Sequence, residues 1–284
     1  MRIARKSSTA PCSPGTMDNT DFLAENGAPM SKEPASASNL DAESTDRYSS
    51  YLEWKKWDGD RFGQSSDEDQ AYFRKLVALA GPLAGKDVCE VGFGNGALLA
   101  YMGAAGYRMF GVELQEELVQ RASSHGATAV TAIERFPDDL RFDLILLVDV
   151  IEHIDQPEIP GFLASIKARL KPDGRIIARF PNGDSPFGLK NQNGDVTHVT
   201  AIGSKKLGYF ARRVGLDVVY LGAEPLPVAG GSFSKQVKKA VSIPLRYIAR
   251  KLLTTFLTLP MDKSFFSQNL VAVLANPATT KHSG

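Results

Sequence analysis

Apolar and polar positions follow two alternating patterns from Asp87 onward. Short runs rich in β-branched and other apolar residues predict strands at 87–91, 108–113, 128–132, 142–149, 174–180 and 216–221. Segments with helical spacing lie between them and predict helices at 96–105, 115–124, 159–170 and 204–214. Because such alternation needs crossover connections, it predicts an α/β fold, Rossmann-like, with a mostly parallel sheet and helices on both faces.

Two strands and one helix refine this picture. Phe142–Val148 is nearly all apolar, as expected of a central strand that is covered on both faces. A last strand is predicted at 269–275, after a long insertion, and a helix at 67–79 precedes the first strand and stops at Gly81-Pro82.

The N-terminal segment has a different composition. Residues 1–45 are rich in Ser, Ala, Pro, Asn, Asp and Glu, which predicts a disordered tail before one domain at 46–284. Aromatic residues then recur every third position along one side of a predicted helix, at Tyr48, Tyr51, Trp54 and Trp57. This stripe fits either core packing or a lid over a ligand.

Overall composition excludes several classes of protein. Of 284 residues 43% are hydrophobic and 23% charged, which is typical of a globular chain. The two cysteines, Cys12 and Cys89, support neither a disulfide framework nor a zinc cluster. No secretory signal or uncharged apolar run of about 18 to 20 residues is present, so we expect a cytoplasmic protein.

A glycine-rich loop follows the first predicted strand. The run Glu90-Val-Gly-Phe-Gly-Asn-Gly96 opens a helix, where glycines allow a tight turn and close approach of a ligand to free N–H groups. Glu113 ends the second strand, 21 residues after Gly92, where a carboxylate can accept both hydroxyls of a ribose. Together these features predict an adenosine-type cofactor.

The identity of that cofactor depends on the loop's charge. Gly92-x-Gly94-x-x-Ala97 also satisfies the dinucleotide pattern, so an NAD-dependent oxidoreductase or epimerase is an alternative. However, Glu90 would repel a pyrophosphate and attract the ammonium of a methionine, and Gly96 comes one residue early for NAD. We therefore favour S-adenosylmethionine.

The sequence resembles the class I S-adenosylmethionine-dependent methyltransferases. The matching runs are Glu90–Gly96, Gly111–Glu113, Phe142–Asp149, Val150–Ile154 and Leu170–Gly174. The resemblance implies a seven-stranded sheet whose last strand is antiparallel. It also implies that Glu90, Gly92, Gly94 and Gly96 line the methionine end of the cofactor and that Glu113 holds the ribose.

The resemblance is incomplete at the adenine end. Many relatives carry an Asp after the third strand, whereas this chain reads Thr131-Ala-Ile-Glu134. The candidate adenine contacts are therefore Ala132, Ile133 and Glu134, and we take Ile133 as the cofactor-binding residue. Asp149, at the end of the fourth strand, is a further candidate cofactor contact.

Asp149, Glu152 and His153 follow the fourth strand. If the chain turns helical there, these residues converge on one face and could hold a divalent cation such as Mg²⁺. Ubiquinone-type relatives use Glu-x-x-Glu-His for magnesium, and Asp149 replaces the first Glu of that motif. The alternative is that Glu152 and His153 only brace the turn.

A second polar set lies in the long loop at 181–203. It consists of Asn182, Asp184, Asp195 and His198. His198 is our candidate general base because the unperturbed pKa of histidine lies near neutral pH. The alternative is a His that only holds the loop; Asp149 and His153 complete the candidate catalytic set.

These observations predict methyl transfer from S-adenosylmethionine to an oxygen. The run Asp149–His153 looks like ubiquinone-biosynthesis O-methyltransferases and sugar or polysaccharide methyltransferases, so a small-molecule, sugar, polysaccharide or lipid-linked acceptor is expected. A non-enzyme alternative is a cofactor-binding regulatory subunit without turnover.

The insertion at 222–268 concentrates positive charge. Residues 1–224 carry 25 basic and 31 acidic side chains, whereas residues 225–284 carry 8 basic side chains and only Asp262. Pro244 and Pro260 predict the ends of a helix, with an apolar stripe at Leu245, Ile248, Ala249, Leu252, Leu253 and Phe256.

The insertion has two possible partners. Either it caps the acceptor cleft, or 235–258 contacts an anionic membrane at its inner face. Nucleic acid is disfavoured because stacking aromatics do not accompany the basic residues.

Overall fold

The computed structural model describes residues 61–226, 233–257 and 262–277, all within the unit formed by residues 47–284. The expected tail at 1–45 and the aromatic stripe at 48–57 lie outside the described residues. Every helix within the described ranges is too short or too polar to cross a lipid bilayer.

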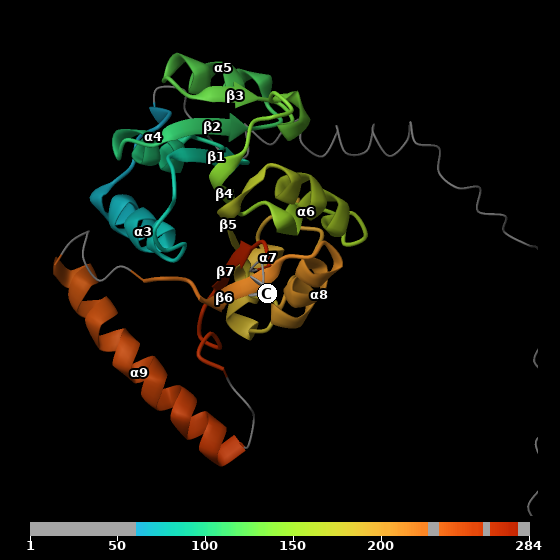
Figure 1. Cartoon of the computed structure of the whole chain (residues 1–284). Helices are drawn as coiled ribbons and strands as arrows, with labels where there is room; N and C mark the ends of the chain where they lie inside the picture. Colours follow the sequence, from blue (N-terminus) through green and yellow to red (C-terminus); the bar gives the residue numbers. More distant parts are fainter. Residues whose placement is uncertain (1–60, 227–232, 258–261, 278–284) are drawn as a thin grey trace, which may run out of the picture. The chain divides into compact units, whose positions relative to one another are not determined.

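The described residues form a seven-stranded sheet with the order β3-β2-β1-β4-β5-β7-β6 (Figure 1). Its strands are β1 (Asp87–Val91), β2 (Arg108–Val112), β3 (Thr128–Val130), β4 (Phe142–Val148), β5 (Leu170–Pro181), β6 (Asp217–Ala223) and β7 (Asn269–Ala275). The first five strands are parallel, and β7 is antiparallel to both β5 and β6. The predicted mostly parallel sheet with an antiparallel last strand is confirmed.

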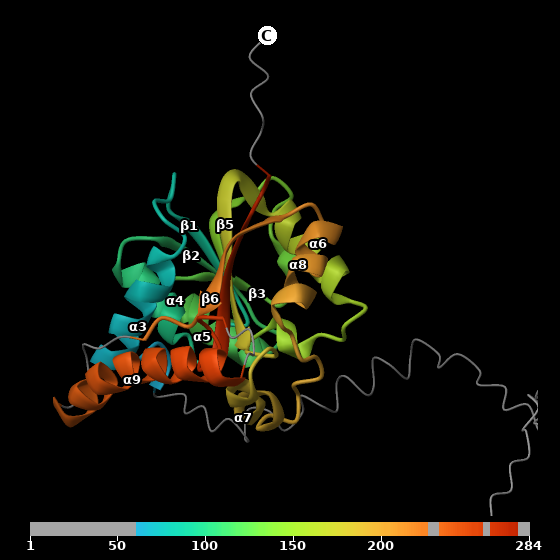
Figure 2. The ribbon, with the colours of Figure 1, turned by 90° about the horizontal axis from the view of Figure 1, so that it is seen from below.

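Helices cover both faces of the sheet (Figure 2). One face packs against α3 (Asp67–Ala78), α4 (Ala97–Ala104) and α5 (Glu116–Ser124), which bury Leu76, Leu98 and Leu118. The other packs against α6 (Ile159–Ala168) and α8 (Ser204–Arg213), which bury Leu163 and Leu207. Because β4 is covered on both faces, its first six residues are all buried, as its apolar sequence predicts.

The long loop after β5 contains more structure than we predicted. A 3₁₀ turn η4 (Pro186–Gly188) leads into the short helix α7 (Leu189–Asn193) before α8 begins. Ser185 starts this segment, since its hydroxyl accepts a hydrogen bond from the backbone N–H of Phe187 at 3.1 Å. The loop therefore places α7 beside the carboxyl end of β5.

The insertion helix differs from the prediction in two ways. Helix α9 (Phe233–Leu257) runs through Pro244 instead of beginning there. The residues before Pro244 include good helix formers, so the helix continues although proline supplies no N–H for the carbonyl of Ala240. Of the two alternatives for the insertion, packing of the apolar stripe on the acceptor cleft does not match the structure, because Leu245, Ile248, Leu252 and Phe256 are exposed.

Candidate active site

Two adjoining cavities lie at the carboxyl ends of the central strands. The larger cavity, of about 570 Å³, is lined by residues that include Glu90, Arg179 and His198. The smaller cavity, of about 350 Å³, is lined by Glu113, Ile133 and other residues. Gly92, Asp149 and His153 line both cavities, so the two adjoin at the ends of β1 and β4.

The glycine loop between β1 and α4 bends in a way that other residues tolerate poorly. Gly92, Gly94 and Gly96 have φ angles of 71°, 50° and 70°. A Cβ on Gly92 would lie only 2.8 Å from a methyl carbon of Val150. Gly92 and Gly94 line the larger cavity, whereas Gly96 lines neither cavity; a side chain on Gly96 would collide with the Phe62 ring.

Glu90 is a buried carboxyl at the wall of the larger cavity. Its side chain is almost fully enclosed, and Oε2 has no hydrogen-bond partner among the described residues. Burial, and then the Glu113 charge, raise the pKa of Glu90 well above its usual range. A bound ammonium group would offset both effects, so the site fits the amino end of S-adenosylmethionine.

Glu113 is held in place by the backbone. It accepts hydrogen bonds from the N–H of Gly94 at 3.1 Å and from the N–H of Leu114 at 2.8 Å. Burial raises the pKa of Glu113, and these backbone donors lower it only in part. The carboxylate keeps unused acceptor sites, and it lies on a mostly apolar cavity suited to a nucleoside.

The adenine candidates also lie together. Ala132, Ile133 and Glu134 all line the smaller cavity, beside Leu114 and Val150. Ile133 begins the 3₁₀ turn η2 (Ile133–Arg135), which follows β3 and turns the chain around this end of the cavity.

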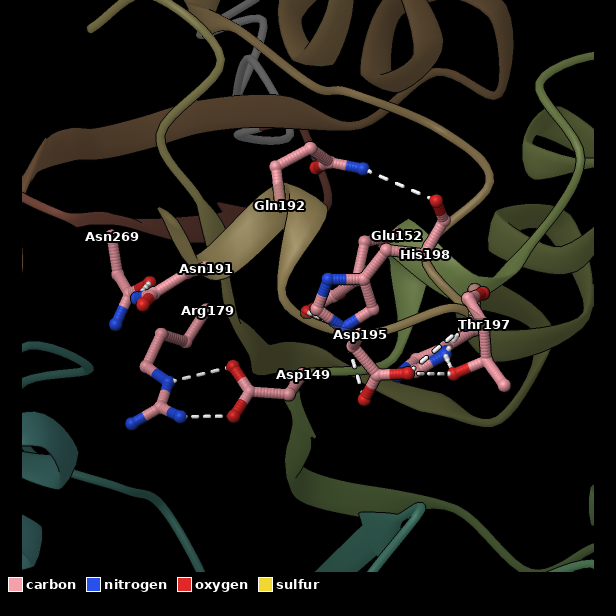
Figure 3. Close-up of polar contacts among 10 residues, drawn as sticks. Asp149, Glu152, Arg179, Asn191, Gln192, Asp195, Thr197, His198 and Asn269 are labelled. Atoms are coloured by element: carbon pink, nitrogen blue, oxygen red, sulfur yellow. Dashed lines mark hydrogen bonds and ion pairs between the residues drawn. The ribbon is translucent and has the colours of Figure 1, made fainter. Parts of the chain in front are cut away.

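Asp149 adopts an unusual backbone conformation at the end of β4. Among the described non-glycine residues it alone has a positive φ, of 57°. Its carboxylate accepts two hydrogen bonds from the guanidinium of Arg179, one of them at 2.9 Å from Nε (Figure 3). This fork-to-fork pair fixes the orientation of both side chains.

Arg179 joins three elements at the base of the larger cavity. Its Nη1 donates to the Tyr72 hydroxyl of α3 and to Glu224 Oε1, each at 3.1 Å. Burial alone would lower the pKa of Arg179, but Asp149, Tyr72 and Glu224 together raise it well above its usual range. We did not predict Arg179; the available signal was a cation within the otherwise apolar run 176–181 of β5.

Glu152, His153, Asp195 and His198 form a second polar cluster on the larger cavity. Figure 3 shows Glu152, Asp195 and His198 of this cluster. The imidazole of His198 lies between two buried carboxylates, with Nε2 at 3.9 Å from Glu152 Oε1 and 3.8 Å from Asp195 Oδ2. The His153 ring lies edge-on to the His198 ring, with the centroids 4.6 Å apart. The structure therefore brings the predicted His153 and His198 together from separate loops.

Backbone bonds explain this convergence. The carbonyl of Glu152 accepts the N–H groups of Val199 and Thr200, each at 3.0 Å, which holds the 195–200 loop against the turn after β4. Thr197 completes the connection, because its Oγ1 lies 2.9 Å from His153 Nδ1 and 2.5 Å from Asp195 Oδ1.

The same cluster could hold a metal ion. Among the described residues, Glu152, His153 and His198 each offer a ligand atom within 4.8 Å of the others. Neither oxygen of Glu152 has a hydrogen-bond partner there, so the donor set fits a divalent cation. This grouping differs from the predicted one: only Ile151–His153 is helical (η3), so Asp149 lies outside that turn and binds Arg179 instead.

The other two residues of the predicted loop set are structural. Asn182 Nδ2 donates to the carbonyls of Ser264 and Ser267, which ties the loop to the chain entering β7. Asp184 Oδ2 accepts the N–H of Ser204 at 2.6 Å and so caps the first turn of α8. The polar residues that instead reach the larger cavity are Tyr72, Lys190, Asn191 and Asn269.

Comparison with known proteins agrees with this architecture. Residues 65–221 match the family model of a methyltransferase domain. The chain is 26% identical over 167 residues to the ubiquinone biosynthesis O-methyltransferase of Bradyrhizobium diazoefficiens, covering 56% of this chain and 65% of that protein. It is 32% identical over 111 residues to the same-named protein of Actinobacillus pleuropneumoniae serotype 7, covering 34% and 47%. The chain spans about half the length of the curated relatives it matches.

Solved structures share the fold. A methyltransferase from Archaeoglobus fulgidus, described as SAM dependent, aligns with a TM-score of 0.55 at 19% identity, covering 79% of this chain and 98% of that one. The 1,6-didemethyltoxoflavin-N1-methyltransferase of Burkholderia thailandensis aligns at 0.51 and 19% identity, covering 89% and 94%. The chain belongs to the class I S-adenosylmethionine-dependent methyltransferase superfamily.

Proposed function

We propose that this protein transfers a methyl group from S-adenosylmethionine to an oxygen of a hydroxylated small molecule. The observation that carries the proposal is a pair of carboxyls on the two adjoining cavities, the buried Glu90 and the half-buried Glu113. Glu90 lies on the larger cavity with one oxygen that has no hydrogen-bond partner among the described residues, and Glu113 lies on the smaller one. A cation and a ribose at these places would match the amino and nucleoside ends of the cofactor.

The cofactor would span both cavities where they adjoin, beside Gly92 and Asp149. Glu113 would accept the ribose hydroxyls, while Ile133 and Leu114 would contact the adenine on the apolar wall. Glu90 would face the ammonium, and Gly92 and Gly94 would allow the methionine to lie against the backbone. When bound, S-adenosylmethionine supplies a methyl group on a positively charged sulfur.

The rest of the larger cavity would bind the acceptor. Tyr72 and Phe73 give it aromatic walls, and Asn191 gives it a polar contact. The Asp149–Arg179 pair would fix the floor against which the acceptor hydroxyl is aligned for in-line attack. The relatives named as ubiquinone biosynthesis O-methyltransferases support oxygen as the atom that is methylated.

His198 would receive the proton. The acceptor oxygen would take the methyl group that bound S-adenosylmethionine supplies, with S-adenosylhomocysteine as the leaving group, and the hydroxyl proton would pass to a ring nitrogen of His198. The Asp195 carboxylate would stabilise the resulting imidazolium, and the imidazolium would in turn favour the charged form of Glu152, whose pKa burial raises well above its usual range. Both side chains lie within 4 Å of Nε2. Asp149 does not suit this role, because the Arg179 guanidinium binds both of its oxygens.

A divalent cation is a second way to activate the same hydroxyl. Glu152, His153 and His198 would hold it, and its positive charge would lower the pKa of an acceptor hydroxyl. His198 would then serve as a ligand and not as the base.

Calorimetry with S-adenosylhomocysteine tests the cofactor assignment. We expect the product to bind, NAD not to bind, and Glu113→Ala to weaken product binding by at least about tenfold through loss of hydrogen bonds to a charged group. Glu116→Ala is the matched control, because Glu116 is exposed and lines neither cavity.

Methyl transfer to a panel of hydroxylated compounds then tests the reaction. Binding of NAD in place of S-adenosylhomocysteine would refute the assignment in favour of an oxidoreductase. Tight binding of S-adenosylhomocysteine without turnover of any acceptor would instead support a cofactor-binding regulatory subunit.

A further inference from the structure

Helix α9 exposes a continuous apolar stripe. The stripe consists of side chains spaced by three or four residues, which places them on one face of a helix: Val237, Val241, Leu245, Ile248, Leu252 and Phe256. Each of these side chains is between 44% and 78% exposed. A contiguous exposed apolar surface of this kind marks a site of interaction with a protein or a membrane.

The opposite face of α9 is the one that contacts the rest of the described chain. Lys239 Nζ donates to Glu68 Oε1 of α3 at 2.6 Å. Ile243, Arg246 and Arg250 line a cavity of about 270 Å³ together with residues such as Glu224 and Phe266. The apolar stripe therefore lies on the side of the helix that these contacts leave uncovered.

The charges around the stripe have one sign. Lys238 and Lys251 lie at its two edges at 100° per residue, and both are exposed. The sequence holds no acidic residue between Glu224 and Asp262. A surface that covers the stripe thus meets apolar side chains bordered by cations, which matches the interface of an anionic bilayer.

We propose that the apolar stripe of α9 binds the surface of an anionic membrane, with the helix lying in the plane of the interface. The apolar side chains would enter the boundary between headgroups and acyl chains. Lys238 and Lys251 would contact anionic headgroups on either side.

A second copy of the chain fits this surface less well. Pairing two stripes would place Lys238 and Lys251 of each helix at the edges of the interface, and α9 has no carboxylate to neutralise them. Glu224 connects the cavity beside α9 with the larger cavity of the candidate active site. It lines the cavity beside α9 and accepts a hydrogen bond from Arg179, which lines the larger cavity. The proposal concerns a surface and does not depend on methyl transfer.

Vesicle co-sedimentation of the full chain tests the proposal without acceptor or cofactor. We expect binding to phosphatidylcholine vesicles that contain phosphatidylglycerol, and weaker binding to phosphatidylcholine alone. The double variant Ile248→Glu/Leu252→Glu should lower the partition coefficient at least about tenfold, because it places two carboxylates in the stripe. Its matched control is Tyr209→Glu/Val219→Glu, since those side chains have similar exposure outside α9.

Charge reversal tests the edges of the stripe separately. Lys238→Glu/Lys251→Glu should reduce binding to the anionic vesicles at least about tenfold, and added salt should weaken wild-type binding. Lys205→Glu/Arg213→Glu, an equal charge change on α8, should have little effect.

Two results would overturn the proposal. One is equal sedimentation of the wild type and the stripe variant, including no binding by either. The other is a wild-type dimer in analytical ultracentrifugation that the stripe variant dissociates, which would assign the stripe to a second copy of the chain.

Discussion

Asp149 and His198 show how neighbouring residues decide the chemistry of a side chain. Both line the larger cavity, and both were candidate catalytic residues from the sequence. The carboxylate of Asp149 is bound by Arg179 through both oxygens and is a poor proton acceptor. His198 Nδ1 has no hydrogen-bond partner among the described residues, and Nε2 faces two carboxylates. His198 is therefore the better placed of the two to receive a proton.

Replacing His198 tests this distinction. We expect His198→Ala to lower kcat by about 10²–10⁴-fold, the usual contribution of a general base, while binding of S-adenosylhomocysteine stays unchanged. Calorimetry and methyl-transfer kinetics measure the two effects. His125→Ala is the control, because His125 is exposed and lies outside both cavities.

Chelation separates the two roles open to His198. If His198 acts as the base without a metal, exhaustive dialysis against EDTA leaves kcat unchanged. If it is a ligand with Glu152 and His153, dialysis abolishes turnover and added Mg²⁺ or another divalent cation restores it. Near wild-type turnover by His198→Ala would contradict both roles.

At the scale of elements, sequence periodicity predicted most of the fold. The glycine loop and the apolar β4 strand follow from local patterns, because each depends on burial or turn chemistry within its own segment. The antiparallel direction of β7 was implied instead by the family resemblance. The 181–203 loop could not be predicted in the same way. Its shape depends on contacts with distant residues, such as the bond from Asn182 to Ser264 and those from Val199 and Thr200 to Glu152.

Two features of the structure needed information that periodicity does not contain. The partner of Asp149 depends on the register of β4 and β5, which places Val148 opposite Arg179. The course of α9 through Pro244 depends on whether the flanking helix tolerates a missing hydrogen bond. Local rules favoured Pro244 as a helix start, and the structure shows it in the interior.

Pro244 should therefore weaken α9 locally. Proline in a helix interior costs about 3 kcal/mol relative to alanine, so Pro244→Ala should slow amide hydrogen exchange in α9 by up to about 100-fold. Hydrogen-exchange mass spectrometry measures this for peptides of the helix. The control is Ser242→Ala in the same helix, which should change the exchange rate only slightly. Equal exchange rates in Pro244→Ala and the wild type would show that Pro244 does not limit the stability of α9.

At the scale of the whole described unit, the two ends of the sheet serve different purposes. The carboxyl ends of β1, β2, β4 and β5 carry the two cavities, with buried carboxyls that raise the cost of folding. The amino ends of β1, β4 and β5 carry a polar network. Lys171 Nζ donates to Asp143 Oδ2 at 2.7 Å and to Asp87 Oδ2 at 2.9 Å. Arg108 also binds Asp87, and the backbone N–H of Asp87 donates to Asp143.

This network should stabilise the fold independently of the active site. Lys171→Met leaves Asp143 and Asp87 without their shared cation. Since Asp143 is buried and Lys171 is only partly exposed, we expect a loss of about 2–4 kcal/mol in the free energy of unfolding. Binding of S-adenosylhomocysteine should stay at the wild-type value. Urea unfolding measures the loss, and Lys86→Met, an exposed lysine beside the same strand, should change stability by less than about 0.5 kcal/mol.

The stabilisation of the fold by the bonds of Lys171 to Asp143 and Asp87 should also depend on pH. Burial raises the pKa of Asp87, but its bonds to Lys171 and Arg108 outweigh burial and lower it below its usual value. The pKa of Lys171 is raised, chiefly by its bonds to Asp143 and Asp87. The stabilisation from Asp87 is thus present above its unfolded pKa of about 3.9 and lost as pH falls through the lower folded value. The stabilisation from Lys171 is present below its unfolded pKa of about 10.4 and lost as pH rises through the higher folded value. The difference in unfolding free energy between wild type and Lys171→Met should therefore be largest between about pH 5 and 10 and shrink towards about pH 3.

Urea unfolding over this pH range checks the prediction. A difference that stays constant down to about pH 3 would show that Lys171 acts through packing and not through charge.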